Sequence, residues 1–278
     1  MPSTYAHYRF GEEVRRGLNG SAKETVSAYP ELFLIGLHGP DIFFYYKPLW
    51  KSEVNRAGHI MHEWSGEKFF ALAKEAVEKA KNREAAKAYL YGVICHFTLD
   101  AFCHGYVEEV IQETGISQVG LEVEFDRRLM IKDGLNPIRH RLTDHIEATP
   151  ENAAVIADFY AFYGGISKED VLKALQDINF YSDLLLAPDP VKRYVILALM
   201  RVTGIYQSLH GFIVGYRANP ACRESNRRLH QLYKQALALA PKLITECEEG
   251  FTADTKDTSD NKSFRHPIYQ RSFSPKEN

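Results

Sequence analysis

The chain has 278 residues, of which 45% are hydrophobic and 25% are charged, a balance typical of a folded globular protein. Its 34 basic and 36 acidic residues nearly cancel, which argues against the broad basic surface that duplex nucleic-acid binding needs. Aromatic residues make up 12% of the chain, enough for a ring-rich core or an aromatic-walled pocket.

Signals for export or membrane insertion are missing from the sequence. The N-terminal stretch MPSTYAHYRFGEEVRRG has no apolar segment typical of a secretory signal, and no run of about 18 apolar residues follows. None of the four cysteines forms a CxxC pair. We therefore expect a cytoplasmic protein with reduced thiols and no transmembrane helix.

Helical signals follow one another along most of the chain. Start signals include Ser65, Thr149 before Pro150, Ser167 with Asp170, and Asp189 before Pro190. No alternating pattern typical of strands is present. The expected helical segments are 65–82, 82–114, 149–165, 167–178, 189–216 and 219–250.

These signals predict an all-α protein with a single multi-helix domain over residues 1–251. Residues 252–263 are polar and read as a linker. The C-terminal part, within 252–278, contains three aromatic residues in FRHPIYQRSFSPKEN that could dock on the domain.

Two connections carry polar residues of interest. The stretch GLHGPDIFFYYKP, residues 36–48, places Asp41 at a corner between two apolar runs. A second, polar connection covers residues 132–149 and contains Asp144 and His145, which we interpret as a short helix facing solvent.

The most informative stretch is HFTLDAFCH, which repeats a metal-binding residue type at every fourth position: His96, Asp100 and His104. On a helix these side chains fall within an arc of about 80°. One metal ion could bind His96 and Asp100 but hardly all three, so Asp100 is better placed to bridge two ions. The structural alternative is a pair of core histidines that hydrogen-bond Asp100.

Other candidate ligands lie in the first half of the chain. His59 and His62 are three residues apart in AGHIMHEW. His7 lies in an aromatic-rich N-terminal stretch, and Glu122 lies on a helical face with Phe125. Each alone is explained as well by a structural role.

In this order and spacing the residues resemble the zinc-dependent phospholipase C family, an all-α phosphodiesterase fold with three zinc ions that single-strand-specific zinc nucleases share. The resemblance covers residues 1 to about 130 and rests on these positions: His7, Asp41, His62 or His59, His96, Asp100, His104 and Glu122.

The resemblance implies a role for each residue. Asp41, His96, Asp100 and His62 or His59 would hold one zinc ion, with Asp100 bridging to a second ion bound by His7. A third ion would lie between His104 and Glu122. Water activated by the metal would attack phosphorus in line, with Asp41 as the candidate general base.

This sequence departs from the family pattern in three places. The interval from Asp100 to His104 is shorter, and Gln118 stands where the family has a histidine four residues before Glu122. The secreted enzymes also bind zinc through the amine of an N-terminal Trp, a place that Pro2 would take here after removal of Met1. Two or three zinc ions are therefore expected.

Function remains open between two classes. The first is a phosphodiester hydrolase acting on a phospholipid headgroup, a soluble phosphodiester or a nucleotide. Aromatic residues near the candidate ligands would suit a choline-like cation, a stacked base or core packing: Tyr5, Tyr8, Phe43, Phe44, Tyr45, Tyr46 and Trp64. The second is a non-catalytic helical protein with a degenerate metal site that serves stability or partner binding.

Overall fold

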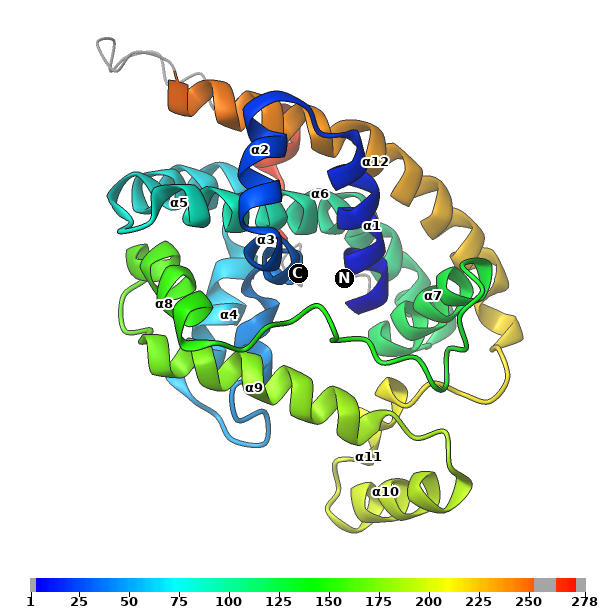
Figure 1. Cartoon of the computed structure of the whole chain (residues 1–278). Helices are drawn as coiled ribbons and strands as arrows, with labels where there is room; N and C mark the ends of the chain where they lie inside the picture. Colours follow the sequence, from blue (N-terminus) through cyan, green and yellow to red (C-terminus); the bar gives the residue numbers. More distant parts are fainter. Residues whose placement is uncertain (1–3, 253–263, 274–278) are drawn as a thin grey trace.

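The computed structural model describes residues 4–252 and 264–273. Within these residues the chain forms twelve α-helices joined by loops and short 3₁₀ helices, and no β-strand is present (Figure 1). The all-α class expected from the sequence is therefore confirmed. Pro2 and most of the expected linker, from residue 253 to residue 263, lie outside the described residues.

The α-helices follow one another in this order: α1 (Thr4–Gly17), α2 (Gly20–Ala28), α3 (Pro30–Gly36), α4 (Glu53–Glu63), α5 (Gly66–Lys79), α6 (Arg83–Thr114), α7 (Gln118–Lys132), α8 (Pro150–Phe159), α9 (Lys168–Leu185), α10 (Pro190–Val202), α11 (Tyr206–Leu209) and α12 (Arg223–Thr252). The 3₁₀ helices are η1 (Gly39–Tyr45), η2 (Tyr160–Phe162), η3 (His210–Phe212), η4 (Pro220–Cys222) and η5 (Pro267–Gln270).

Side chains at the helix starts explain several of these boundaries. Ser65 accepts a hydrogen bond from the backbone N–H of Lys68, and Thr149 caps α8 in the same way. Ser167 and Asp170 form a reciprocal capping box at the start of α9. These start signals, predicted from the sequence, are confirmed.

Helix α6 forms the centre of the molecule and packs most extensively against α3 and α12 (Figure 1). Glycines allow the close approach to α3: a Cβ on Gly36 would lie 2.3 Å from the carbonyl oxygen of Tyr89, and one on Gly92 would lie 2.2 Å from that of Phe33. This contact holds the chain that follows α3, including Asp41, against the middle of α6.

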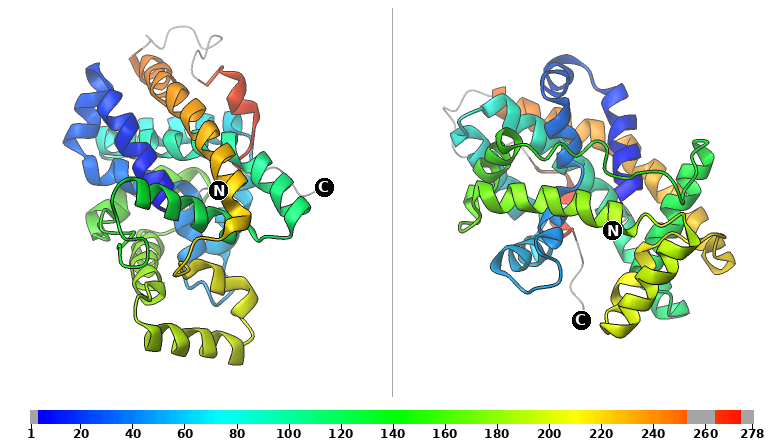
Figure 2. Two further views of the ribbon diagram at one scale, coloured as in Figure 1. Left: turned by 90° about the vertical axis from the view of Figure 1, so that its right-hand side faces the viewer. Right: turned by 60° about the horizontal axis from the view of Figure 1, so that its bottom comes forward.

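The C-terminal residues 264–273 pack against α5 and α6, where they are drawn in red in Figure 2. The ring of Phe273 is fully buried, with its centroid 4.9 Å from that of Phe97. The carbonyl oxygen of Arg271 accepts a 2.7 Å hydrogen bond from the N–H of Gly66, and the Arg271 guanidinium donates to the carbonyl oxygen of Ala101. The C-terminal segment thus closes the core beside α6.

The helix expected over residues 189–216 is wrong in extent. It begins with Asp189 as its cap, as expected, but α10 ends at Val202. Gly204 then takes a φ of +76°, which reverses the chain into the short α11. Together α10 and α11 form a small lobe at one end of the molecule, with its own apolar cluster around Met200 and Ile213 (Figures 1 and 2).

In the described part of the chain, no helix has both the length and the continuous apolar character that crossing a bilayer requires.

Candidate metal centre

His96 and Asp100 lie one turn apart on α6, and both side chains are fully buried. The Nε2 atom of His96 lies 3.2 Å from Oδ2 of Asp100. The Nδ1 atom of His96 lies 3.1 Å from the carbonyl oxygen of Leu37, to which it can donate. That hydrogen bond places the ring proton on Nδ1 and leaves Nε2 as a lone-pair donor facing Asp100.

Asp41 and His62 approach this pair from η1 and α4. The Nε2 atom of His62 lies 2.6 Å from Oδ1 of Asp41, and Nε2 of His96 lies 3.9 Å from the same oxygen. The Nδ1 atom of His62 is 2.7 Å from the carbonyl oxygen of Gly58, which orients the ring as Leu37 orients His96.

A glycine makes this approach possible. Gly39 has a φ of +49°, and a Cβ there would lie 2.5 Å from Cδ2 of the His96 ring. Any other residue would be strained at this φ and would press on the imidazole. The Gly-Pro-Asp sequence therefore brings Asp41 to the ring of His96.

His7 reaches Asp100 from α1. Its Nε2 atom lies 3.2 Å from Oδ1 of Asp100, and its ring stacks on that of His96 with a centroid distance of 4.4 Å. Asp100 therefore lies between two imidazoles, one on each carboxylate oxygen.

The position of α1 depends on Asp126 of α7. Its carboxylate accepts hydrogen bonds from the backbone N–H groups of Tyr5 and Ala6, at 2.9 Å and 2.8 Å. A helix leaves its first N–H groups without partners inside the helix, and a buried carboxylate satisfies two of them here. The sequence analysis did not identify this role of Asp126.

These residues form two groups whose ligand atoms lie within 4.8 Å of one another: His7, His96 and Asp100, and Asp41, His62 and His96. In the described part of the chain, these buried polar atoms face one another and have no hydrogen-bond partner outside the two groups: Nε2 of His7, His62 and His96, Oδ1 of Asp41, and both carboxylate oxygens of Asp100. Such atoms are costly to bury unless something binds them. Imidazole nitrogens and carboxylate oxygens together are the ligands that Zn²⁺ prefers, so the residues fit the metal.

The other candidate ligands predicted from the sequence lie outside these two groups. His59 is exposed, packs on the ring of Phe44 and joins neither group, whereas His62 is buried beside Asp41. Of the two alternatives left open by the sequence, the structure therefore brings only His62 to the other ligands. His104 and Glu122 are both buried, but neither belongs to a three-residue group among the described residues.

Burial and neighbouring charges set the protonation of the centre. Burial lowers the pKa of His96 to about 4, although the carboxylate of Asp100 partly offsets it. Burial alone would raise the pKa of Asp100, but the adjacent His96 and His7 hold it below its usual range. At neutral pH the pair is therefore a neutral imidazole and a carboxylate, the forms that bind metal.

His62 differs because of its short contact with Asp41. Burial favours the neutral ring, yet the hydrogen bond and charge of Asp41 together raise the pKa of His62 above its usual value. A cation between the two side chains would replace this proton.

A second pair of histidines was missed by the sequence analysis. Nε2 of His38 lies 2.8 Å from Nε2 of His145, and the His145 ring stacks on that of Tyr8. Burial lowers the pKa of His145 to about 4 and that of His38 well below its usual range. The expectation of a solvent-facing short helix at His145 is wrong, because this contact draws the connection inward. His38 directly precedes the Gly-Pro-Asp corner, the one signal that could have drawn attention to it.

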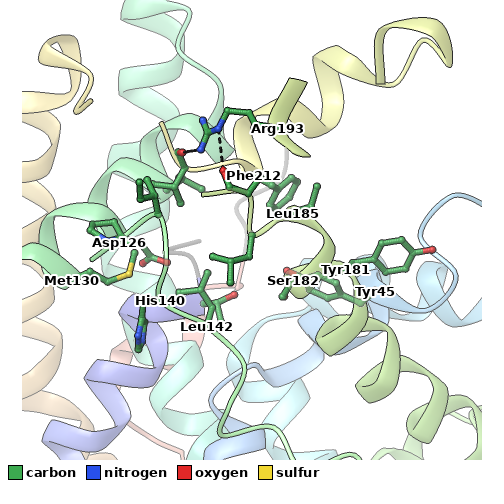
Figure 3. Close-up of a pocket in the computed structure, with 17 residues that line it drawn as sticks. Tyr45, Asp126, Met130, His140, Leu142, Tyr181, Ser182, Leu185, Arg193 and Phe212 are labelled. Carbon is green, nitrogen blue, oxygen red and sulfur yellow. Dashed lines mark hydrogen bonds between the residues drawn. The ribbon is translucent and has the colours of Figure 1, made fainter. Parts of the chain in front are cut away.

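A pocket opens between α7, α9 and the loops that lead to α8 and α12 (Figure 3). Its walls are mainly apolar, with polar groups at Asp126, His140 and Arg193; the apolar part includes Val123, Met130, Ile138, Leu142, Leu185, Phe212 and Val214. Tyr45 lines it too, and burial together with the nearby Asp41 raises the pKa of Tyr45 to about 12. Tyr45 therefore lines the pocket and also lies near one candidate ligand, Asp41.

Comparison with known proteins gives one match. A family model described as zinc dependent phospholipase C matches residues 6–170, from α1 into α9, a range that contains all the candidate ligands. No curated protein and no solved structure matches the chain.

Proposed function

The chain belongs to the zinc-dependent phospholipase C family, and from this premise we propose that it is a zinc-dependent phosphodiester hydrolase. The observation that carries the proposal is the convergence of buried ring nitrogens and carboxylate oxygens that have no hydrogen-bond partner outside the centre. The ligands proposed for two zinc ions are His7, Asp41, His62, His96 and Asp100.

Each of these side chains has a distinct task in the proposed reaction. His62 and His96 present Nε2 because the carbonyl oxygens of Gly58 and Leu37 hold their Nδ1 protons. Asp100 presents one oxygen to His7 and the other to His96, and it is the proposed bridge. Zinc bound here would supply Lewis acidity to the phosphoryl oxygens and would lower the pKa of a water molecule.

Asp41 is the proposed general base. Its side chain keeps some solvent exposure, 14%, whereas that of Asp100 has none. A carboxylate at the rim of the centre can accept the proton of an attacking water on the oxygen that does not face His62, and it can also release that proton to solvent. Tyr45, at the pocket side of Asp41, would face the substrate.

A third ion is proposed between His104 and Glu122. Gln118 donates a 2.8 Å hydrogen bond from its amide nitrogen to Oε1 of Glu122, so it orients the carboxylate rather than offering a ring nitrogen. An amide oxygen is a poorer zinc ligand than an imidazole. This ion is therefore expected to bind more weakly than the other two.

Gln118 also favours the second candidate function, a non-catalytic protein with a degenerate metal site. In that case zinc would stabilise the fold without hydrolysis. Metal content and turnover measured on the same preparations distinguish the two functions.

The test uses protein purified without chelator, with His96→Ala and the matched His59→Ala variant. We expect at least two zinc equivalents per chain in the wild type and in H59A, and loss of zinc in H96A. Hydrolysis of a chromogenic phosphodiester and of short-chain phosphatidylcholine should follow the metal content. Zinc without turnover on either substrate would support the non-catalytic function, and failure to bind added zinc would refute the centre itself.

A further inference from the structure

Helix α10 turns large apolar side chains toward solvent. Of the eleven exposed large hydrophobic residues in the described part of the chain, seven lie between residues 180 and 202. Five of them are on α10, with these exposed fractions: Val191 69%, Tyr194 74%, Val195 48%, Leu199 58% and Val202 85%. A contiguous cluster of exposed apolar side chains on one short helix is typical of a surface that binds a protein, a membrane or a ligand.

The five side chains form one stripe. At about 100° per residue they fall within an arc of about 140°. Met200, which is buried in the apolar cluster of the lobe, lies on the opposite side of the helix. The stripe therefore faces away from the body of the protein, and α10 itself stands at one end of the molecule in both views (Figures 1 and 2).

All charged side chains of α10 are basic. The helix, PVKRYVILALMRV, has three basic residues and no acidic one. Lys192 and Arg201 are exposed and, by helical spacing, border the stripe on its two sides. Arg193 points inward and donates hydrogen bonds to the carbonyl oxygens of Ala187 and Val214.

We infer that α10 docks the protein on the surface of a lipid bilayer, with the apolar stripe in the headgroup region and the flanking cations on anionic headgroups. Aliphatic and aromatic side chains bordered by Lys and Arg are the pattern of helices that lie in a membrane interface. Thirteen residues span about 20 Å, too short to cross the hydrocarbon core of about 30 Å. The helix therefore lies on the bilayer.

The pocket adjoins α10. Arg193 of α10 and Leu185 of α9 line it, together with Tyr45 and Asp126 (Figure 3). A helix lying on lipid would hold this pocket next to the bilayer.

A second copy of the chain fits the stripe less well. Two α10 helices in face-to-face contact would bring Lys192 and Arg201 of both copies together without an acidic residue on either helix. Like charges across an interface are repulsive, whereas anionic headgroups neutralise them.

The test is sedimentation of the full chain with vesicles of phosphatidylcholine, with and without phosphatidylglycerol. Chelator is present throughout, so that binding is measured independently of zinc and of hydrolysis. The variant Leu199→Ser is compared with Ile131→Ser on α7, because the two side chains are 58% and 55% exposed. We expect binding by the wild type that phosphatidylglycerol strengthens, a loss of about tenfold in partitioning for L199S, and no change for I131S.

Several results would overturn the inference: no vesicle binding by the wild type, equal binding by L199S and I131S, or equal binding with and without the anionic lipid. Light scattering runs beside the assay. A mass of two chains that L199S halves, without vesicle binding, would assign the stripe to a second copy instead. If circular dichroism shows that L199S is misfolded, Val202→Ser at the end of the helix replaces it, because that side chain is 85% exposed.

Discussion

Replacing Asp126 by Asn tests how α1, and with it His7, is held at the metal centre. Asp126 is only 2% exposed, and its two oxygens accept the N–H groups of Tyr5 and Ala6 at 2.9 Å and 2.8 Å. Asn keeps one acceptor oxygen, but its amide group would face the other N–H donor to donor. The variant therefore leaves one buried N–H without a partner and removes the negative charge at the start of a helix.

The magnitude follows from these two losses. An unsatisfied buried N–H costs about 1–3 kcal/mol, and the charge at the helix terminus contributes about 1 kcal/mol. Together they predict that Asp126→Asn lowers the free energy of unfolding by about 3 kcal/mol. For a chain of this size that corresponds to roughly 5 °C in the midpoint of thermal unfolding.

The assay is urea unfolding of metal-free protein, followed by circular dichroism. The control is Asp144→Asn, since Asp144 is 65% exposed and pairs with Arg141 on the surface, where such pairs contribute about 0.5 kcal/mol. Zinc titration should also show weaker binding in D126N, because His7 lies on the first turns of α1. If D126N unfolds at the same urea concentration as D144N, the carboxylate does not anchor α1 and the reasoning fails.

Three further predictions concern the surroundings of the centre. Gly39→Ala should lose zinc, because its Cβ would lie 2.5 Å from the His96 ring. The control is Gly134→Ala: Gly134 also has a positive φ (+77°) but lies in open space, so the substitution should cost only backbone strain of about 1–3 kcal/mol and keep zinc. Equal zinc binding by both variants would contradict this prediction. Burial lowers the pKa of His145 from 6.5 to about 4. As the pH falls through this window, the unfolded chain takes up a proton that the folded protein does not, so stability is lost. His145→Gln removes this group and should reduce that loss by about 3 kcal/mol, measured as the difference in the free energy of unfolding between neutral pH and the acid end of the window. Phe273→Ala should lower the free energy of unfolding by about 3–5 kcal/mol, because the ring is fully buried; a cost below about 1 kcal/mol would mean that the C-terminal segment does not close the core.

Local signals in the sequence determined the fold class and most helix starts. Ser65, Thr149 and Ser167 cap helices by bonding backbone groups three residues away, so a short window contains both partners. The separation of four residues between His96 and Asp100 is equally local, because one helix carries both residues. The end of α10 before Gly204 escaped prediction, since the residues on both sides of the break are apolar and favour continuation.

Only the tertiary structure decided which distant side chains meet. His59 and His62 are equivalent by residue type, and the packing of α4 turns His62 toward Asp41 and leaves His59 in solvent. His38 and His145 lie 107 residues apart, and no local pattern links them. The exposure of the α10 stripe could not be predicted from the sequence, because periodicity shows that a helix has an apolar face but not what covers it. Contacts between distant segments depend on how whole helices pack, and that information lies in no single stretch of the chain.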